Sequence, residues 1–387
     1  MGFDSVTEFS LRDIDHVYID SKVVGSSVAR RAFNLFEPSR VSIVEAEPFA
    51  DDKGELSALQ FDRSKKNIYL TEFKGTFFKR CPGARPGLTC CNYFVLNLGL
   101  QCNMNCSYCY LQSFINTPVM KIYTNIEQAL NELEVMGRDL SGETLRVGTG
   151  EVIDSLSLDP LSLYSRELIR FFRKYPKWKL EFKTKSSQVD QFLDVEHAGN
   201  VVVSFSMNPQ NVIASEEHGT ASLLGRLEAA AKCRDRGFPL AFHFDPMIWH
   251  DGWRESYAQL VREVTARFAP HEVPISSVGA LRFQPEQRHL MRERFGLSSM
   301  VTSAEVVSSA DGKLRYDQSV REEMFEFLIG EFRKHSAEWR IFLCMETPET
   351  WLGAVKAMPK SVVGLEQAFD GRVARVFGAR KEIEKGI

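Results

Sequence analysis

Residues 94–112, FVLNLGLQCNMNCSYCYLQ, join an apolar run to a loop with three cysteines. The run over residues 94–99 predicts a short buried strand. The loop spaces its cysteines as CxxxCxxC: Cys102, Cys106 and Cys109. The segment NIEQALNELEVM, which begins at Asn125, predicts a helix. A strand, a cysteine loop and a helix in this order predict the first unit of an α/β fold with reactive groups in the loop after the strand.

Five further strands are expected downstream, each separated from the next by a helical segment. The strand candidates are TLRVGTG at 144, KLEFKT at 179, VVVSFSM at 201, LAFHFDPM at 240 and ISSVGALRF at 275. One helical pattern places Leu161, Tyr164, Leu168 and Phe171 on one face, and another begins at Leu223. Six strands with helical crossovers predict a parallel α/β sheet.

The regions on either side of these units are expected to form smaller parts of the fold. Residues 1–93 predict a small N-terminal α/β module, with strands near 16, 40 and 67 and a helix near 25–36. Residues 94–296 hold the six strand–helix units. Residues 297–387 predict a C-terminal extension with a hairpin at an Asp311-Gly312 turn, a helix near 318–335 and a last strand, RIFLCME.

Composition and charge exclude several classes of protein. The chain has 387 residues, of which 44% are hydrophobic and 26% charged, so it can bury a core without disulfide bonds. Its 48 Lys and Arg against 51 Asp and Glu give a net charge of −3, which removes any global argument for nucleic-acid binding. The apolar runs fall short of the ~20 residues that span a bilayer. The polar N-terminus lacks a secretory signal pattern, so we expect a cytoplasmic protein without membrane association.

The cysteines carry the strongest chemical signal. Six of the eight lie between positions 81 and 109, and in a reducing compartment such a cluster favours metal binding or redox chemistry over disulfides. Three closely spaced thiolates can hold three corners of a 4Fe-4S cluster and leave the fourth iron open for a ligand. A structural zinc site would need a fourth ligand, such as Cys90, Cys91 or a histidine. Three unrelated core thiols are a third interpretation.

At these residues the sequence resembles the radical S-adenosylmethionine (SAM) superfamily, in which an aromatic residue, here Tyr108, precedes the third cysteine. More narrowly, CNMNCSYCYLQ and four later segments are similar, in the same order, to the spore photoproduct lyase family. Those segments are FKTKSSQVDQFLD, VSFSMNPQNVI, LLGRLEAAAKCRDRGFPLAFHFDPMIWHDGW and LRFQPEQ. The resemblance implies a partial (β/α)6 barrel of the TIM type, a 4Fe-4S cluster, and SAM bound at the open iron.

The resemblance also implies roles for individual residues. The cluster would be ligated by Cys102, Cys106 and Cys109. SAM would be bound by Glu151, Lys185 and Ser206, because a carboxylate suits its ammonium group and an ammonium suits its carboxylate. Solvated side chains at strand ends are the alternative for Glu151 and Lys185. Tyr108 and Tyr110 match two tyrosines thought to pass a hydrogen atom back to SAM, and packing around the cluster is their alternative.

Two features depart from the family pattern. The lyases carry a hydrogen-donating cysteine after the second strand, and alignment through Arg146 and Asp154 places Glu151 in that position. A hydrogen donor would therefore have to come from elsewhere. The chain also has three cysteines just before the first barrel strand, where the family has fewer: Cys81, Cys90 and Cys91. They could be buried structural thiols, replacements for the missing donor, or ligands of a second metal together with Cys344.

The resemblance implies a DNA-repair lyase that cleaves SAM to a 5'-deoxyadenosyl radical and so initiates carbon–carbon bond scission in a thymine photoproduct. Its partners would be UV-damaged DNA and an electron donor such as flavodoxin or ferredoxin. Local basic residues could contact phosphates: Lys74, Lys79, Arg80, Arg85, Arg282, Arg288, Arg292 and Arg294. A solvated face over a Phe-rich core is the plainer interpretation of these residues. The expected DNA-probing hairpin near 303–317 adds only Lys313 and Arg315.

Two other functions remain open at this stage. The same radical chemistry could act on another modified base, a peptide or a small molecule, because the donor position is substituted and the local basicity is modest. The second is an iron–sulfur protein that binds nucleic acid or carries electrons without cleaving SAM. The GTGE motif and Lys185 argue against this second function.

Overall fold

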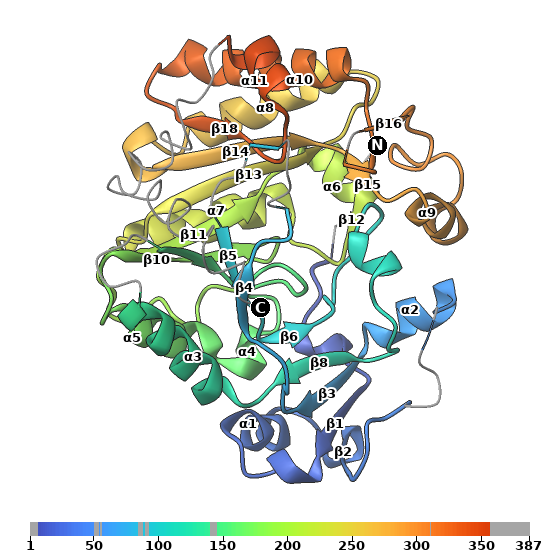
Figure 1. The fold of residues 1–387 in the computed structure, drawn as a ribbon, viewed down its shortest axis with the longest axis vertical. Coiled ribbons are helices and arrows are strands. Elements are labelled where there is room, and N and C mark those ends of the chain that lie inside the picture. The colour runs from blue at the N-terminus through green and yellow to red at the C-terminus, as the bar shows by residue number, and fades with distance from the viewer. Residues whose placement is uncertain are drawn as a thin grey trace.

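The fold is built around an eight-stranded sheet that curls into a half-barrel (Figure 1). The computed structural model describes residues 7–49, 54, 56–83, 88–89, 93–139, 145–309 and 311–356. The strands follow the order β18-β14-β13-β11-β10-β9-β5-β4. Their bounds are β4 Phe78–Arg80, β5 Tyr93–Leu96, β9 Leu145–Gly148, β10 Trp178–Thr184, β11 Val201–Ser206, β13 Leu240–Met247, β14 Ile275–Ala280 and β18 Ile341–Leu343.

The six strands predicted from the sequence are confirmed as neighbours in this sheet, and β5, β9, β10, β11, β13 and β14 all run parallel. Every residue of β9, β11 and β14 is buried, which agrees with the many apolar residues in these strands. The sheet extends beyond these six strands. The last strand in the described residues, β18, pairs parallel to β14, and β4 pairs antiparallel to β5 at the other edge.

Helices cover the outer face of the half-barrel. The helices in this layer are α3 Ile126–Asp139, α4 Asp159–Ser162, α5 Tyr164–Phe172, α6 Gln210–Glu216, α7 Leu223–Asp235, α8 Trp253–Thr265 and α10 Gln318–His335. Helix α5 contacts β10, α7 contacts β11 and β13, and α10 contacts β14. The predicted apolar face is confirmed, since Leu161, Tyr164, Leu168 and Phe171 are all buried.

A second, smaller sheet lies at the end of the molecule opposite α10 and α11 (Pro348–Val355) (Figure 1). Its strand order is β2-β1-β3-β8-β6. The bounds are β1 His16–Asp20, β2 Val41–Val44, β3 Asn67–Thr71, β6 Gly99–Leu100 and β8 Met120–Tyr123, and the helices beside it are α1 Ser27–Leu35 and α2 Ala58–Ser64. The predicted N-terminal strands and helix are therefore present. Two strands from beyond residue 93 complete this sheet.

The C-terminal part contains the predicted hairpin and helix. Strands β16 Val307–Ser308 and β17 Leu314–Arg315 pair antiparallel, and β15 Arg282–Phe283 joins β17. Gly312 has a φ of 80°, the left-handed conformation that such a turn requires. Helix α9 spans Gln287–Phe295. No helix in the described part of the chain is both long and apolar enough to cross a membrane.

Short elements complete the chain. The single-turn helices are η1 Leu11–Asp13, η2 Ser21–Val23, η3 Pro38–Arg40, η5 Tyr110–Ser113 and η6 Pro270–Glu272. A two-stranded ribbon joins β7 Asn105–Cys106 to β12 Glu217–His218. Strand β7 of this ribbon lies within the cysteine loop, and the ribbon is part of the site described next.

Candidate active site

The cysteine loop follows β5 and β6 at the carboxyl end of the first parallel strand, the edge at which barrel enzymes place reactive groups. Cys106 lies in β7 and is buried, and Cys102 and Cys109 are partly buried. The backbone amide of Cys109 donates to the carbonyl of Cys106 at 3.1 Å, so the last two cysteines close a tight turn. The amide of Met104 points at the sulfur of Cys102, at 3.4 Å.

Apolar side chains line the outer side of this loop. Cys102 and Cys109 pack against a small separate cluster of buried residues: Leu56, Phe61, Leu111, Ile115 and Val152. Burial raises the pKa of the Cys102 thiol to about 12, and it raises the pKa of Cys106 as well. Thiolates in such surroundings need a cationic partner, because desolvation penalises the bare anion.

The loop receives a buried cation from the N-terminal region. The Lys65 ammonium donates to the carbonyl oxygens of Cys102 at 2.9 Å and Met104 at 2.6 Å. Desolvation lowers the pKa of Lys65. The sequence analysis missed this residue, because nothing in the pattern around Lys65 relates it to a loop 37 residues later.

Helix α9 holds the other side of the loop. The Gln287 side-chain amide donates to the carbonyls of Tyr108 at 3.1 Å and Cys109 at 3.0 Å. Arg294 donates to Gln112 at 2.7 Å and to Asp62 at 2.5 Å, and it also contacts the side chain of Asn105. Helix α9 therefore joins the cysteine loop to α2.

The three cysteines of the loop are candidate ligands of a metal centre. Among the residues described, no group of three or more His, Cys, Asp or Glu side chains has the arrangement that holds one metal ion. A 4Fe-4S cluster takes one thiolate per iron, so its ligands need not converge on one point as those of zinc do. The buried thiols of one short loop suit a soft, cationic cluster. The structural zinc interpretation stays open, because Cys90 and Cys91, its possible fourth ligands, lie outside the described residues.

Glu151 and Tyr110 lie beside each other at the end of β9. The Tyr110 hydroxyl donates to the backbone carbonyl of Glu151 at 2.8 Å, and the Lys79 ammonium lies 3.3 Å from the Glu151 carboxylate. Gly150 lets this turn approach β10 closely, because a Cβ there would meet the Lys183 carbonyl at 2.7 Å. The predicted SAM ligand after the second strand and one of the two predicted tyrosines are therefore neighbours.

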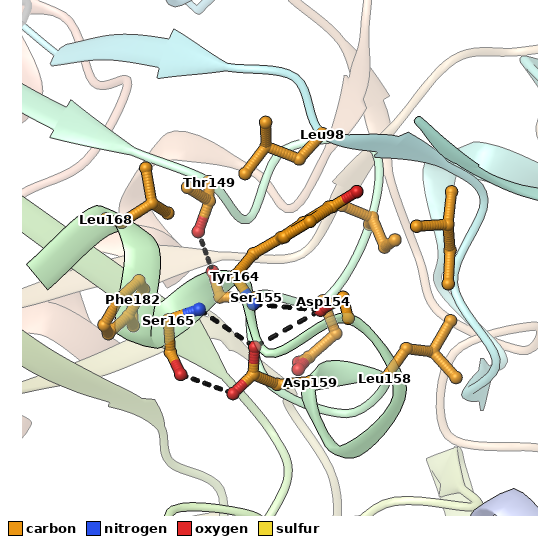
Figure 2. Close-up of a pocket in the computed structure, with 13 residues that line it drawn as sticks. Leu98, Thr149, Asp154, Ser155, Leu158, Asp159, Tyr164, Ser165, Leu168 and Phe182 are labelled. Atoms are coloured by element: carbon orange, nitrogen blue, oxygen red, sulfur yellow. Dashed lines mark hydrogen bonds between the residues drawn. The ribbon is translucent and has the colours of Figure 1, made fainter. Parts of the chain in front are cut away.

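Asp154 fastens this turn to the end of β10, and it is one of the residues that line the cavity drawn in Figure 2. One carboxylate oxygen accepts from the amides of Leu156 at 3.0 Å and Ser157 at 2.9 Å and from the Thr184 hydroxyl at 2.7 Å. The other accepts from the amide of Lys185 at 2.9 Å. Asp154 also lines a cavity of about 30 Å³, which has room for one water molecule. This carboxylate fixes the position of Lys185 relative to the turn that carries Glu151.

Lys185 and Tyr108 form a second pair of neighbours. The Lys185 ammonium lies 5.7 Å from the centre of the Tyr108 ring, within range of a cation–π contact. The Tyr108 hydroxyl donates to Glu217. Ser206 is the last residue of β11 and is buried, and its carbonyl accepts from Arg226 at 2.8 Å. The segment that contains Glu217 and Arg226 is another feature that the sequence analysis missed.

A buried polar network crosses the inside of the half-barrel. Glu181 accepts from Arg146 at 2.7 Å and from Ser204 at 2.7 Å, and its carboxylate lies 2.7 Å from Nε2 of His243. Although desolvation opposes it, Arg146 and His243 hold the pKa of Glu181 below its usual range. Desolvation, reinforced by Lys183, lowers the pKa of His243 to about 4. His243 is therefore a neutral structural donor to Glu181 at neutral pH.

The remaining cysteines are spread over several places. Cys233 is buried in α7, as expected for a core thiol. Cys81 follows β4, and its amide donates to the carbonyl of Tyr93 at 2.9 Å. Cys344 follows β18, and its amide donates to the carbonyl of Val278 at 2.8 Å. Cys90 and Cys91 lie outside the described residues, so their proposed roles stay predictions.

Most arginines that were expected to contact DNA form hydrogen bonds within the protein. Arg282 forms two hydrogen bonds with Asp245, at 2.7 and 2.9 Å. Arg288 and Arg292 donate to backbone carbonyls at 3.0 and 3.3 Å, and Arg315 binds Asp311. Together with Arg294, these side chains shape the C-terminal part of the fold. Arg85 lies outside the described residues.

Comparisons with known proteins agree with this architecture. A family model for spore photoproduct lyase matches residues 15–313. The spore photoproduct lyases of Bacillus subtilis and a Geobacillus species are 34% and 31% identical over 43% and 44% of this chain. The chain spans about half the length of these two relatives, at 48% and 50%. The spore photoproduct lyase of Clostridium acetobutylicum is 23% identical over 81% of this chain and 93% of its own length.

Solved structures of spore photoproduct lyase share the fold. A variant with bound AdoMet and dinucleoside spore photoproduct aligns with a TM-score of 0.73 at 21% identity, over 85% of this chain and 98% of that chain. A complex with dinucleoside spore photoproduct alone aligns with a TM-score of 0.72 over the same shares. A mostly parallel half-barrel with a cysteine loop after its first parallel strand is the partial TIM-type barrel of radical SAM proteins. Within that class, the chain belongs to the spore photoproduct lyase family.

Proposed function

We propose that the protein is a radical SAM lyase that repairs a thymine photoproduct in DNA by carbon–carbon bond scission. The observation that carries this proposal is the meeting of the cysteine loop with two neighbouring strand ends. Tyr110 of the loop contacts the Glu151 turn, and Lys185 of the next strand lies over Tyr108. Family membership supports the same activity. A cytoplasmic location stays part of the proposal.

Different residues at this edge of the barrel would bind the cluster and SAM. Cys102, Cys106 and Cys109 would hold a 4Fe-4S cluster, for which their burial in one loop is favourable. When bound, the cluster and SAM would supply the one-electron chemistry that starts the reaction. Ion pairing and hydrogen bonding would orient SAM through three side chains: Glu151, Lys185 and Ser206. The apolar residues around the loop would keep water away from the thiolates.

Cys81 is our candidate for the missing hydrogen donor. Alternate residues of an extended segment share a face, so Cys81 follows Lys79 on the face of β4 that meets Glu151. Its S–H would give a hydrogen atom to the carbon radical of the substrate, forming a C–H bond and a thiyl radical. The thiyl radical would regain a hydrogen atom from the O–H group of Tyr110. The phenoxyl radical left on Tyr110 would in turn take a hydrogen atom from a C–H bond of 5'-deoxyadenosine, so that the unpaired electron ends on the nucleoside. In D2O, where thiols exchange, product deuteration should be lost in Cys81→Ala and kept in Cys233→Ala.

The proposed activity is tested with anaerobically reconstituted protein. The protein is incubated with dithionite, SAM and UV-irradiated DNA rich in spore photoproduct, and 5'-deoxyadenosine and restored thymine are measured by mass spectrometry. Lesion-dependent thymine release is expected, and Cys106→Ala should abolish it, whereas the buried thiol variant Cys233→Ala should retain it. SAM cleavage without thymine release would reject this substrate. A reducible cluster without SAM cleavage would reject the radical lyase itself.

One observation favours a second candidate, the same chemistry on a different substrate. Arg282, Arg288, Arg292 and Arg294 all make contacts within the protein, which leaves fewer of their donors for binding phosphates. Another modified base, a peptide or a small molecule would need fewer such contacts than duplex DNA. Substrate competition in the same assay separates the two candidates. Flavodoxin or ferredoxin is the proposed electron donor in either case.

A further inference from the structure

One segment, residues 216–226, contacts four of the positions predicted to form the site. It begins at the end of α6 and ends in the first turn of α7. We call it the bracket. The four positions lie on three separate elements: Cys106, Tyr108, Lys185 and Ser206. The sequence analysis gave this segment no role beyond the family resemblance of its second half.

On one side the bracket holds the cysteine loop. Its strand β12 pairs antiparallel with β7, so that Glu217 lies opposite Cys106. The Ser107 amide donates to the carbonyl of Glu216 at 2.8 Å, and the Ser107 hydroxyl donates to the Glu216 carboxylate. The Tyr108 hydroxyl donates to the carboxylate of Glu217. Two consecutive glutamates therefore fix the two residues between the second and third cysteines.

On the other side the bracket holds the carboxyl ends of two barrel strands. The Ala221 amide donates to the carbonyl of Lys185 at 2.9 Å, just after β10. Arg226 donates to the carbonyl of Ser206 at 2.8 Å, at the end of β11. Both contacts are to backbone oxygens, so they locate the strand ends themselves.

An ion pair joins the two sides. The Arg226 guanidinium lies 2.5 Å from the Glu217 carboxylate, and both side chains are completely buried. Asn208 donates to Glu217 at 2.8 Å, and Arg226 also donates to the Thr220 hydroxyl at 2.7 Å and to the Ala221 carbonyl at 3.0 Å. A buried ion pair is seldom the most stable solution for a core, since well-packed apolar residues can serve as well or better. In this protein the ion pair fixes the distance and direction between the cysteine loop and the strand ends.

We propose that Glu217 and Arg226 are positioning residues that set the spacing between the cysteine loop and the SAM-binding strand ends. This inference rests on the proposed function, because it assigns the two sides of the bracket to cluster and SAM. Neither side chain needs to touch substrate. Loss of the ion pair should leave the three cysteine ligands in place. The positions of Lys185 and Ser206 relative to these cysteines should become less fixed.

The first test needs no cofactor. Hydrogen exchange is compared in the full-length protein as purified, for Glu217→Gln, for the milder Thr220→Val and for an exposed control, Glu323→Gln, whose partner is Arg254. In both bracket variants, peptides that cover residues 105–109 and those that cover 184–187 and 205–208 should lose protection together. The loss should be smaller in Thr220→Val, which folds without leaving a buried charge unpaired. Exchange that rises on one side only, or on neither side, overturns the proposal.

The second test uses reconstituted protein. Glu217→Gln should retain its iron, while its SAM affinity falls by about 10- to 100-fold and the SAM-induced change in the EPR spectrum of the reduced cluster weakens. Glu217→Asp, which keeps the charge, should recover part of the affinity. SAM binding within twofold of the unmodified protein in Glu217→Gln would show a structural role only. If the unmodified protein itself failed to bind SAM, the proposed function would fail, while the exchange test would still decide whether the bracket couples the two sides.

Discussion

Replacement of Asp154 by alanine is expected to release the end of β10 from the Glu151 turn. The carboxylate accepts four hydrogen bonds, and three of their donors are backbone amides, those of Leu156, Ser157 and Lys185. Alanine leaves all four donors without this acceptor. The loop would then lose its fixed connection to Lys185, although the strands themselves would stay intact.

The magnitude follows from the contacts around Asp154. A hydrogen bond to a charged group contributes about 1.5–3 kcal/mol to stability, so the sum of four such bonds is the upper limit of the destabilisation. Relaxation of the loop around the alanine reduces this loss. The cavity of about 30 Å³ beside Asp154 lets water reach part of the vacated space and replace some acceptors. We therefore expect a local destabilisation of about 3 kcal/mol, equivalent to about 100-fold more frequent opening.

Hydrogen exchange measured by mass spectrometry reports this opening directly. Peptides that cover residues 150–158 and 183–188 should exchange about 100-fold faster in Asp154→Ala, and Asp154→Asn should lie between, since one carbonyl oxygen remains. Asp190→Ala is the matched control, because Asp190 forms an exposed ion pair with Lys232. Unchanged protection of the Lys185 amide in a folded Asp154→Ala protein would refute the reasoning.

Three further predictions concern other parts of the structure. Lys65→Met removes the donor to the carbonyls of Cys102 and Met104, so iron retention against a chelator should fall by about tenfold. The pKa of His243 is lowered to about 4 in the fold, against about 6.5 unfolded, so its stabilising contribution is present above pH 6.5 and is lost as the pH falls to 4. Thermal unfolding between pH 7 and 4 should show a loss of about 3 kcal/mol that is absent in His243→Gln. Arg31→Ala removes a donor to the carbonyls of residues 161 and 162, so limited proteolysis near α1 should accelerate while α10 stays resistant.

The sequence predicted the barrel well because its strands carry local signals. Runs such as VVVSFSM are mostly apolar, as is typical of strands buried on both faces, and Gly150 marks the turn after the second strand. The cysteine spacing is equally local. The strands and the cysteine loop can therefore be predicted without knowing which residues pack against them.

The rest of the site depends on contacts between distant residues. Nothing in the residues around Lys65, Glu217 or Gln287 indicates that each one contacts the cysteine loop. Because contacts between distant residues are not visible in the sequence, the arginines of α9 were expected on a DNA-binding surface. Their basicity was visible in the sequence, whereas their engagement with nearby carbonyls and with Asp62 was not.

The three-sided support of the cysteine loop has a consequence for biogenesis. The loop is held by Lys65 from the N-terminal region, by the bracket from the middle of the chain and by α9 in its last third. A ribosome-bound chain that has emerged only as far as its cysteines would therefore present three thiols in a loop without its supports. Iron delivered at that stage would bind a loop that has not yet folded. Iron delivered after residue 294 has emerged would bind a loop whose supporting contacts can already form. If the proposed cluster is bound, its assembly should accordingly follow translation, and truncation that removes Lys65 or α9 should weaken retention of reconstituted iron.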